Sequence, residues 1–251
     1  MKVLAMRDKT DKYTIKKTEL PNLPFRMLMI GGSGSGKSSL LGWLLCNRGE
    51  KGYRDNIKPE NIYIFSGSLT GDYKLSQMVK YLEIPQENLF GHFDNDVVNE
   101  LYDGLVDDFN DPDEPKEHKL IVFDDLGYQN VMNKRVAKSA VDRLFCNGRK
   151  YLISSMILNQ RIIQVNPTCL ANASAVIAYK PNNRDLDIYD SNFNYLPNKD
   201  QFKRLIRRET ENKHSYIVVD FSKDEIYRNK SFEPIKICKC PGKENDCGGF
   251  K

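Results

Sequence analysis

The sequence predicts an α/β fold, in which helices cover both faces of a mostly parallel sheet. Three observations lead to this prediction. A glycine-rich segment at residues 31–38 joins a short apolar run to a helical stretch, and a second apolar run ends in two aspartates. Apolar runs and helical stretches also alternate along residues 26–179, as expected for strands joined by crossover helices.

The expected elements follow from apolar runs, helical periodicity and turn residues. Buried strands are predicted at residues 26–30, 61–65, 119–124, 151–158 and 174–179. Helices are predicted at 37–47 and near 73–82, 96–106 and 131–146. Residues 103–117 are acidic and rich in turn residues, which indicates an exposed loop. Beyond residue 180, a helix at 198–209 precedes a β-hairpin at 216–228, which we expect to extend the sheet edge or to form a small cap.

These elements suggest four segments. Residues 1–21 form an N-terminal extension, 22–180 a core domain, and 181–237 a C-terminal helix and β-hairpin packed on that core. Residues 238–251 are rich in glycine and charge and read as a flexible tail. Cys238, Cys240 and Cys247 lie in this tail; zinc binding is the alternative, although their spacing is not that of a standard zinc knuckle and no His is nearby.

The sequence argues against a membrane-spanning protein and against a secreted one. No apolar run approaches the ~18 residues of a membrane span, and the N-terminus lacks the apolar core of a secretion signal. The six cysteines are irregularly spaced and read as free thiols of a reducing compartment. The net charge of +4 does not by itself indicate a nucleic-acid partner. Residues 203–208 form a basic helix face that could follow a DNA backbone; the alternative is a solvated face or a contact with another subunit.

The glycine-rich segment matches the phosphate-binding loop G-x-x-x-x-G-K-[ST]. Its residues, with the following serine, are Gly31, Gly32, Ser33, Gly34, Ser35, Gly36, Lys37, Ser38 and Ser39. Glycines let the backbone curl so that its N–H groups point at a triphosphate. Lys37 is expected to reach the β- and γ-phosphates, and Ser38 to ligate Mg²⁺. The sequence therefore predicts an ATP and Mg²⁺ site, with ATP preferred because no guanine-recognition string Asn-Lys-x-Asp occurs.

The second apolar run, Leu120–Phe123, ends in Asp124 and Asp125. Ligands of open α/β sheets bind outside the carboxyl ends of the strands, which is where these two acids are expected. Asp124 is predicted to orient Mg²⁺, directly or through water, and Asp125 to act as the general base for the attacking water. The alternative is an acidic turn that caps the next helix.

A third strand, 151–158, leads to Asn159 and Gln160. An amide at the end of such a strand can contact the γ-phosphate or the attacking water. Gln160 is our first choice for this role and Asn159 the second. An ordinary strand-end turn is the alternative, since amides are common in turns.

Together, these residues resemble the viral DNA-packaging ATPases of the FtsK–HerA superfamily, in the branch of poxviruses, other large DNA viruses and virophages. The resemblance covers residues 22–180 and rests on 31–38, 120–125 and 144–160. In that family an Asn-Gly-Arg-basic segment precedes an apolar strand ending in Gln, here Asn147 to Gln160. Lys150 and Asn159 stand where the family usually has His and Ser.

The resemblance implies a P-loop NTPase of the ASCE type, similar to RecA and FtsK. It also implies that strand 151–158 lies between the phosphate-loop strand and the Asp124 strand. Members form rings in which an arginine of one subunit reaches the neighbour's nucleotide. Arg149 is the position-matched candidate for this role and Arg143 the second. A surface arginine with no such role is the alternative.

As for function, the resemblance implies an ATP-hydrolysing motor that moves double-stranded DNA into a capsid. Its partners would be DNA, further copies in a ring of five or six, and a capsid or portal vertex. Its location would be the host-cell cytoplasm at viral factories, with or without virion association. Two alternatives remain open: a small-molecule phosphotransferase such as a nucleotide kinase, and a nucleotide-gated assembly factor without motor activity.

Overall fold

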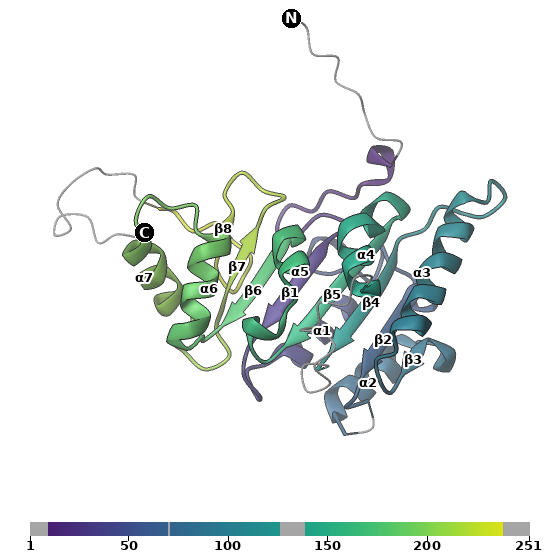
Figure 1. Cartoon of the computed structure of the whole chain (residues 1–251), viewed down its shortest axis with the longest axis horizontal. Helices are drawn as coiled ribbons and strands as arrows, with labels where there is room; N and C mark the ends of the chain where they lie inside the picture. The colour runs from purple at the N-terminus through teal and green to yellow at the C-terminus, as the bar shows by residue number, and fades with distance from the viewer. Residues whose placement is uncertain (1–9, 70, 126–138, 238–251) are drawn as a thin grey trace, which may run out of the picture.

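The computed structural model describes residues 10–69, 71–125 and 139–237. These residues contain one eight-stranded sheet of order β3-β2-β4-β5-β1-β6-β7-β8 (Figure 1). The strands are β1 (Arg26–Ile30), β2 (Ile62–Ser66), β3 (Leu89–Phe90), β4 (Lys119–Asp124), β5 (Ile153–Asn159), β6 (Ala175–Tyr179), β7 (Tyr216–Asp220) and β8 (Tyr227–Arg228). The helices are α1 (Lys37–Cys46), α2 (Tyr73–Leu82), α3 (Asn95–Asn110), α4 (Ala140–Asn147), α5 (Pro167–Asn172), α6 (Asn183–Phe193) and α7 (Lys199–Glu209).

The sheet is parallel from β3 through β6, and only β7 and β8 pair in the antiparallel sense. This confirms the predicted α/β fold with a mostly parallel sheet. It also confirms the strand order implied by the family resemblance, because β5 lies between β1 and β4. The predicted C-terminal hairpin extends the sheet edge, since β7 pairs with β6 and β8 pairs with β7.

Helices cover both faces of the sheet and create two cores. On one face, α1 and α2 pack over apolar side chains of the strands, such as Met27 of β1 and Val122 of β4. On the other face, α3, α4, α6 and α7 cover the alternate residues of the same strands, such as Leu28 and Phe123. Strands buried on both faces need nearly continuous apolar sequence, which is why these runs could be recognised from sequence alone.

The helix starts have a local cause. Asp72 caps α2, Asp94 caps α3 and Asn198 caps α7, each through a side-chain oxygen that accepts backbone N–H groups of the first turn. Two boundaries were wrong by two residues or more. β5 starts at Ile153, because residues Gly148–Tyr151 form a 3₁₀ helix, and α3 continues to Asn110, so the predicted loop over 103–117 starts only after that residue. The many acidic side chains suggested a loop, but Val98, Tyr102 and Leu105 are buried at helical spacing, which keeps the segment in the helix.

Helix α6 was not expected, because its sequence is mostly polar and only Leu186, Tyr189 and Phe193 are buried apolar residues. The helix expected near 131–146 falls partly outside the described residues, where α4 starts at Ala140. The proposed tail 238–251, with its three cysteines, also lies outside the described residues, as do residues 1–9 of the N-terminal extension. Among the described residues, Cys46, Cys146 and Cys169 are free thiols.

Parallel register places the strand ends that matter on one edge. Ile30 of β1 pairs with Asn159 of β5, and Asp124 of β4 pairs with Leu158 of β5. The residues that follow these three strands therefore leave the sheet at the same level. Nowhere in the described parts of the chain is a helix both long and apolar enough to cross a membrane.

Because β5 lies in the middle of the sheet, we expect substitutions of two isoleucines, one in β5 and one outside it, to differ strongly in their effect on stability. Ile157 of β5 is fully buried, whereas Ile163 is 37% exposed. Ile157→Ala should lower the free energy of unfolding by about 2–5 kcal/mol, because it leaves a cavity in the sheet core. Ile163→Ala is the matched control and should stay within about 0.5 kcal/mol of the wild type. Urea unfolding measures both, and equal losses would contradict the placement of β5.

Candidate nucleotide-binding site

The phosphate-binding loop leaves β1 and enters α1, as its motif requires. Gly36 has a φ of 111°, in the left-handed region where a side chain is disfavoured. A Cβ on Gly31 would lie 2.7 Å from both the Cβ of Tyr179 and the Oγ of Ser35. These two glycines are therefore needed for the loop to curl and for it to lie against β6.

Lys37 lies inside the curve of this loop. Its Nζ donates to the carbonyl of Gly31 at 2.6 Å and to that of Gly32 at 3.3 Å. Burial lowers the pKa of Lys37, while Asp124 and Asp125 act to raise it. The ammonium group therefore lies within electrostatic range of both acids, although the phosphate loop and the acids are far apart in the sequence.

Asp124 ends β4 on the face that α1 covers. It is 4% exposed, and its Oδ2 accepts from Ser66 Oγ at 3.0 Å and from Ser68 Oγ at 3.5 Å. Burial raises the pKa of Asp124, the Ser66 hydrogen bond and Lys37 lower it, and Asp125 and Asp72 raise it. A cation placed here would relieve the repulsion among these carboxylates.

Asp125 and Gln160 meet at the ends of β4 and β5. Gln160 Nε2 donates to Asp125 Oδ1 at 3.1 Å. Asp125 has a φ of 49°, an uncommon conformation for a residue with a side chain, and its N–H donates to the Leu158 carbonyl at 3.0 Å. The strand end therefore holds the Asp125 backbone in place, and the amide of Gln160 contacts its carboxylate.

Asn159 points elsewhere. Side chains alternate along a strand, so Asn159 shares the face of Ile153 and Ile157, which pack with α3 and α4. It is 1% exposed, and neither amide atom has a partner among the described residues. Gln160, and not Asn159, is the amide that contacts Asp125.

The two candidate arginines differ in their contacts. Arg143 Nη1 donates to Asn99 Oδ1 and Nη2 to Asp103 Oδ1, both at 2.7 Å, and the guanidinium lies over the Tyr102 ring. It is therefore bound to α3 of its own chain. Arg149 lies in the short 3₁₀ helix Gly148–Tyr151, which precedes β5. It is exposed at the amino edge of the sheet, opposite the edge that carries the phosphate loop.

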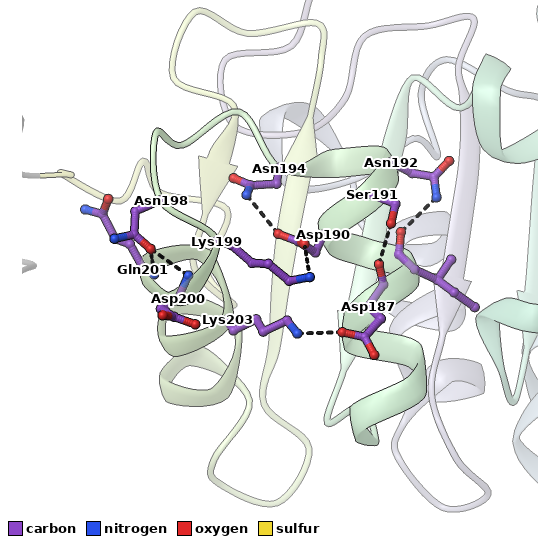
Figure 2. Close-up of polar contacts among 11 residues, drawn as sticks. Asp187, Asp190, Ser191, Asn192, Asn194, Asn198, Lys199, Asp200, Gln201 and Lys203 are labelled. Atoms are coloured by element: carbon purple, nitrogen blue, oxygen red, sulfur yellow. Dashed lines mark hydrogen bonds and ion pairs between the residues drawn. The ribbon is translucent and has the colours of Figure 1, made fainter.

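Two lysines of the basic helix α7 form ion pairs with α6. Lys203 pairs with Asp187 at 2.5 Å and Lys199 pairs with Asp190 at 3.2 Å, as Figure 2 shows. Arg207 donates to Asn183 of the same helix at 3.3 Å. Lys199, Lys203 and Arg207 thus contact α6 of the same chain, and binding of a DNA backbone by the 203–208 face stays a prediction.

Two residues that contact the phosphate loop, Asp72 and His214, were not predicted from the sequence. The carboxylate of Asp72 accepts from Ser38 Oγ at 2.7 Å. Burial raises the pKa of Asp72, but the hydrogen bonds from Ser38, Leu75 and Lys74 outweigh it and the pKa is lowered. His214 Nδ1 donates to the Ser35 carbonyl at 3.0 Å, across 179 residues of sequence. Asp72 could have been noticed as a helix cap just after a strand, whereas nothing local singles out His214.

The oxygen donors suit Mg²⁺. Ser38 offers a hydroxyl and Asp124 offers a carboxylate, which are hard ligands of the kind that Mg²⁺ prefers. Within the described ranges, no group of three or more His, Cys, Asp or Glu side chains could hold a metal by itself. A magnesium ion here would thus depend on phosphate oxygens of a bound nucleotide as well.

Comparison with known structures supports the fold. The genome packaging NTPase B204 of Sulfolobus turreted icosahedral virus 2, in complex with sulfate, matches with a TM-score of 0.55 and 16% identity, over 80% of this chain and 92% of that one. Its complex with AMP gives a TM-score of 0.54 at 14% identity, over 78% and 92%. The DNA-packaging ATPase B204 from Sulfolobus turreted icosahedral virus gives 0.54 at 13% identity, over 78% and 92%. At these identities the likeness establishes a shared fold.

Family membership rests on the sequence itself. No curated protein matches the chain. A family model described as Poxvirus A32 protein matches residues 12–239, which is most of the 251 residues. This match confirms the resemblance to the poxvirus branch that the three sequence motifs indicated. The chain therefore belongs to the Poxvirus A32 protein family.

Proposed function

We propose that this chain is an ATP-hydrolysing translocase that packages double-stranded viral DNA into a capsid. The main support is that the parallel register of β1, β5 and β4 brings the phosphate loop with Lys37 and the acids Asp124 and Asp125 to the same edge of the sheet. A cationic loop next to two carboxylates can hold a metal-bound triphosphate and activate water beside it. Membership of the Poxvirus A32 protein family and the fold shared with the B204 packaging ATPases support the packaging role.

The proposed roles follow from the contacts. Backbone N–H groups of residues 31–39 and the Lys37 ammonium bind the phosphates, and Ser38 and Asp124 hold Mg²⁺. When bound, Mg²⁺ neutralises charge on the β- and γ-phosphate oxygens. Asp125 takes a proton from the attacking water, and Gln160, which contacts its carboxylate, fixes its orientation. We also assign Gln160 the role of responding to loss of the γ-phosphate and passing that change to β5, which its contact with Asp125 supports.

A ring of five or six subunits fits the position of Arg149. It lies on the sheet edge opposite its own phosphate loop, so within one chain it has no access to the nucleotide. If one copy set its amino edge against the carboxyl edge of the next, Arg149 would face the neighbour's γ-phosphate. Capsid or portal contact, and a location at viral factories in the host cytoplasm, complete the proposal.

The test of this function is phosphate release measured with and without double-stranded DNA. We expect release without any acceptor molecule, and stimulation by DNA together with a rise in solution mass. Phosphate transfer only to a small acceptor would instead indicate a nucleotide kinase. Nucleotide binding with negligible turnover, even with DNA present, would indicate an assembly factor without motor activity.

Asp125→Asn should separate binding from hydrolysis. The amide keeps the size of the side chain but cannot take a proton, so turnover should fall by about 10²–10⁴-fold. Nucleotide affinity should remain near that of the wild type, because Asp125 does not contact the phosphate loop in our assignment. Steady-state phosphate release and nucleotide titration measure the two effects. A variant that hydrolyses ATP at the wild-type rate would remove Asp125 as the base.

Arg149→Ala should act on the neighbouring subunit. An arginine supplied in trans can contribute about 10³–10⁵-fold to the rate. Mixing variant subunits with wild-type subunits should therefore lower the ATPase activity by more than the fraction of variant subunits. Lys150→Ala is the matched control, since Lys150 is the exposed neighbour in the same 3₁₀ helix, and it should give no more than a proportional loss. A strictly proportional loss for Arg149→Ala would rule out the trans role.

A further inference from the structure

Asp72 connects the start of α2 to the phosphate loop. One carboxylate oxygen, Oδ1, accepts from the backbone N–H groups of Lys74 at 2.9 Å and Leu75 at 3.2 Å, which caps the helix. The other oxygen, Oδ2, accepts from Ser38 Oγ at 2.7 Å. The two oxygens therefore have separate tasks, one within α2 and one at the loop.

A second contact fixes the same two segments to each other. Lys74 Nζ donates to Ser39 Oγ at 2.7 Å, one residue beyond Ser38. Helices α1 and α2 also pack side by side on one face of the sheet, through side chains such as Leu41 and Leu75. The distance between Asp72 and Ser38 is thus set by the packing of two helices and not by one hydrogen bond alone.

Asp124 is engaged differently. Its Oδ2 accepts from the hydroxyls of Ser66 and Ser68, at the end of β2 and just beyond it. The Ser38 hydroxyl donates its proton to Asp72. The two acids therefore accept from different serines: Asp124 from Ser66 and Ser68, and Asp72 from Ser38.

The chemistry of a hydroxyl gives this contact a consequence. Serine has one O–H donor and two lone pairs, so committing the proton to a carboxylate leaves the lone pairs free to face a cation. Partners that accept from a metal ligand orient that ligand and raise its basicity. We propose that Asp72 is a positioning residue for magnesium: it holds the Ser38 proton so that the Ser38 oxygen faces the Mg²⁺ of bound nucleotide. This inference rests on the proposed function of the same site.

Asp72→Asn isolates the proposed role. Asparagine caps helices as well as aspartate does, so α2 should keep its start. Its NH₂ group, however, cannot accept the Ser38 proton. We expect the gain in affinity for a fluorescent ATP analogue on adding Mg²⁺ to fall by about 10–100-fold, the usual effect of losing a partner of a metal ligand. Affinity measured in EDTA should stay at the wild-type value.

Asp94→Asn is the matched control. Asp94 caps α3 through the same pair of contacts, to the N–H groups of Asp96 at 2.8 Å and Val97 at 3.4 Å. Its variant should retain the full magnesium-dependent gain. Asp72→Ser is a second variant, because serine also caps helices but has no second oxygen for Ser38. Titration of Mn²⁺ by electron paramagnetic resonance, with nucleotide present, gives a readout independent of turnover.

The outcomes are distinct. A magnesium-dependent gain in Asp72→Asn equal to that of Asp94→Asn would overturn the inference. So would an equal loss of affinity in EDTA and in Mg²⁺, because Asp72 would then shape the loop without acting on the metal. In both cases the wild type still binds the nucleotide with Mg²⁺. Absence of any nucleotide binding by the wild type would instead overturn the proposed function, and this inference with it.

Discussion

The parallel register of β1, β5 and β4 is the constraint on which the candidate site depends. It pairs Ile30 of β1 with Asn159 of β5, and Asp124 of β4 with Leu158 of β5. The loop after β1 and the acids at the end of β4 therefore leave the sheet at the same level, on either side of β5. A shift of one residue would turn Asp124 away from the face that α1 covers, because side chains alternate along a strand. The apolar residues that bury β4 on both faces hold this register.

Much of this arrangement could be predicted from the sequence. The apolar runs before Gly31 and Asp124 identified β1 and β4, because strands buried on both faces leave a continuous apolar pattern. The order of the strands could not be predicted from the residues, since crossover helices of similar length can place β5 on either side of β1. That order came from the family resemblance.

The contacts between distant segments were beyond sequence reasoning. Asp72 could be recognised as a helix cap, but its approach to Ser38 depends on how α1 and α2 pack together. His214 reaches the Ser35 carbonyl only because β7 joins the sheet next to β6. The choice between Asn159 and Gln160 depended on which face of β5 each occupies, and the sequence offered the two amides side by side.

ATP hydrolysis at this site requires that Lys37, Ser38 and Asp124 surround one nucleotide. The most direct measurement is a crystal structure with a non-hydrolysable ATP analogue and Mn²⁺, with the metal located by its anomalous signal. We predict phosphates cradled by residues 31–39, with Lys37 at the β- and γ-phosphates and the metal between Ser38 and Asp124. A nucleotide bound elsewhere, or a metal away from both residues, would contradict the account.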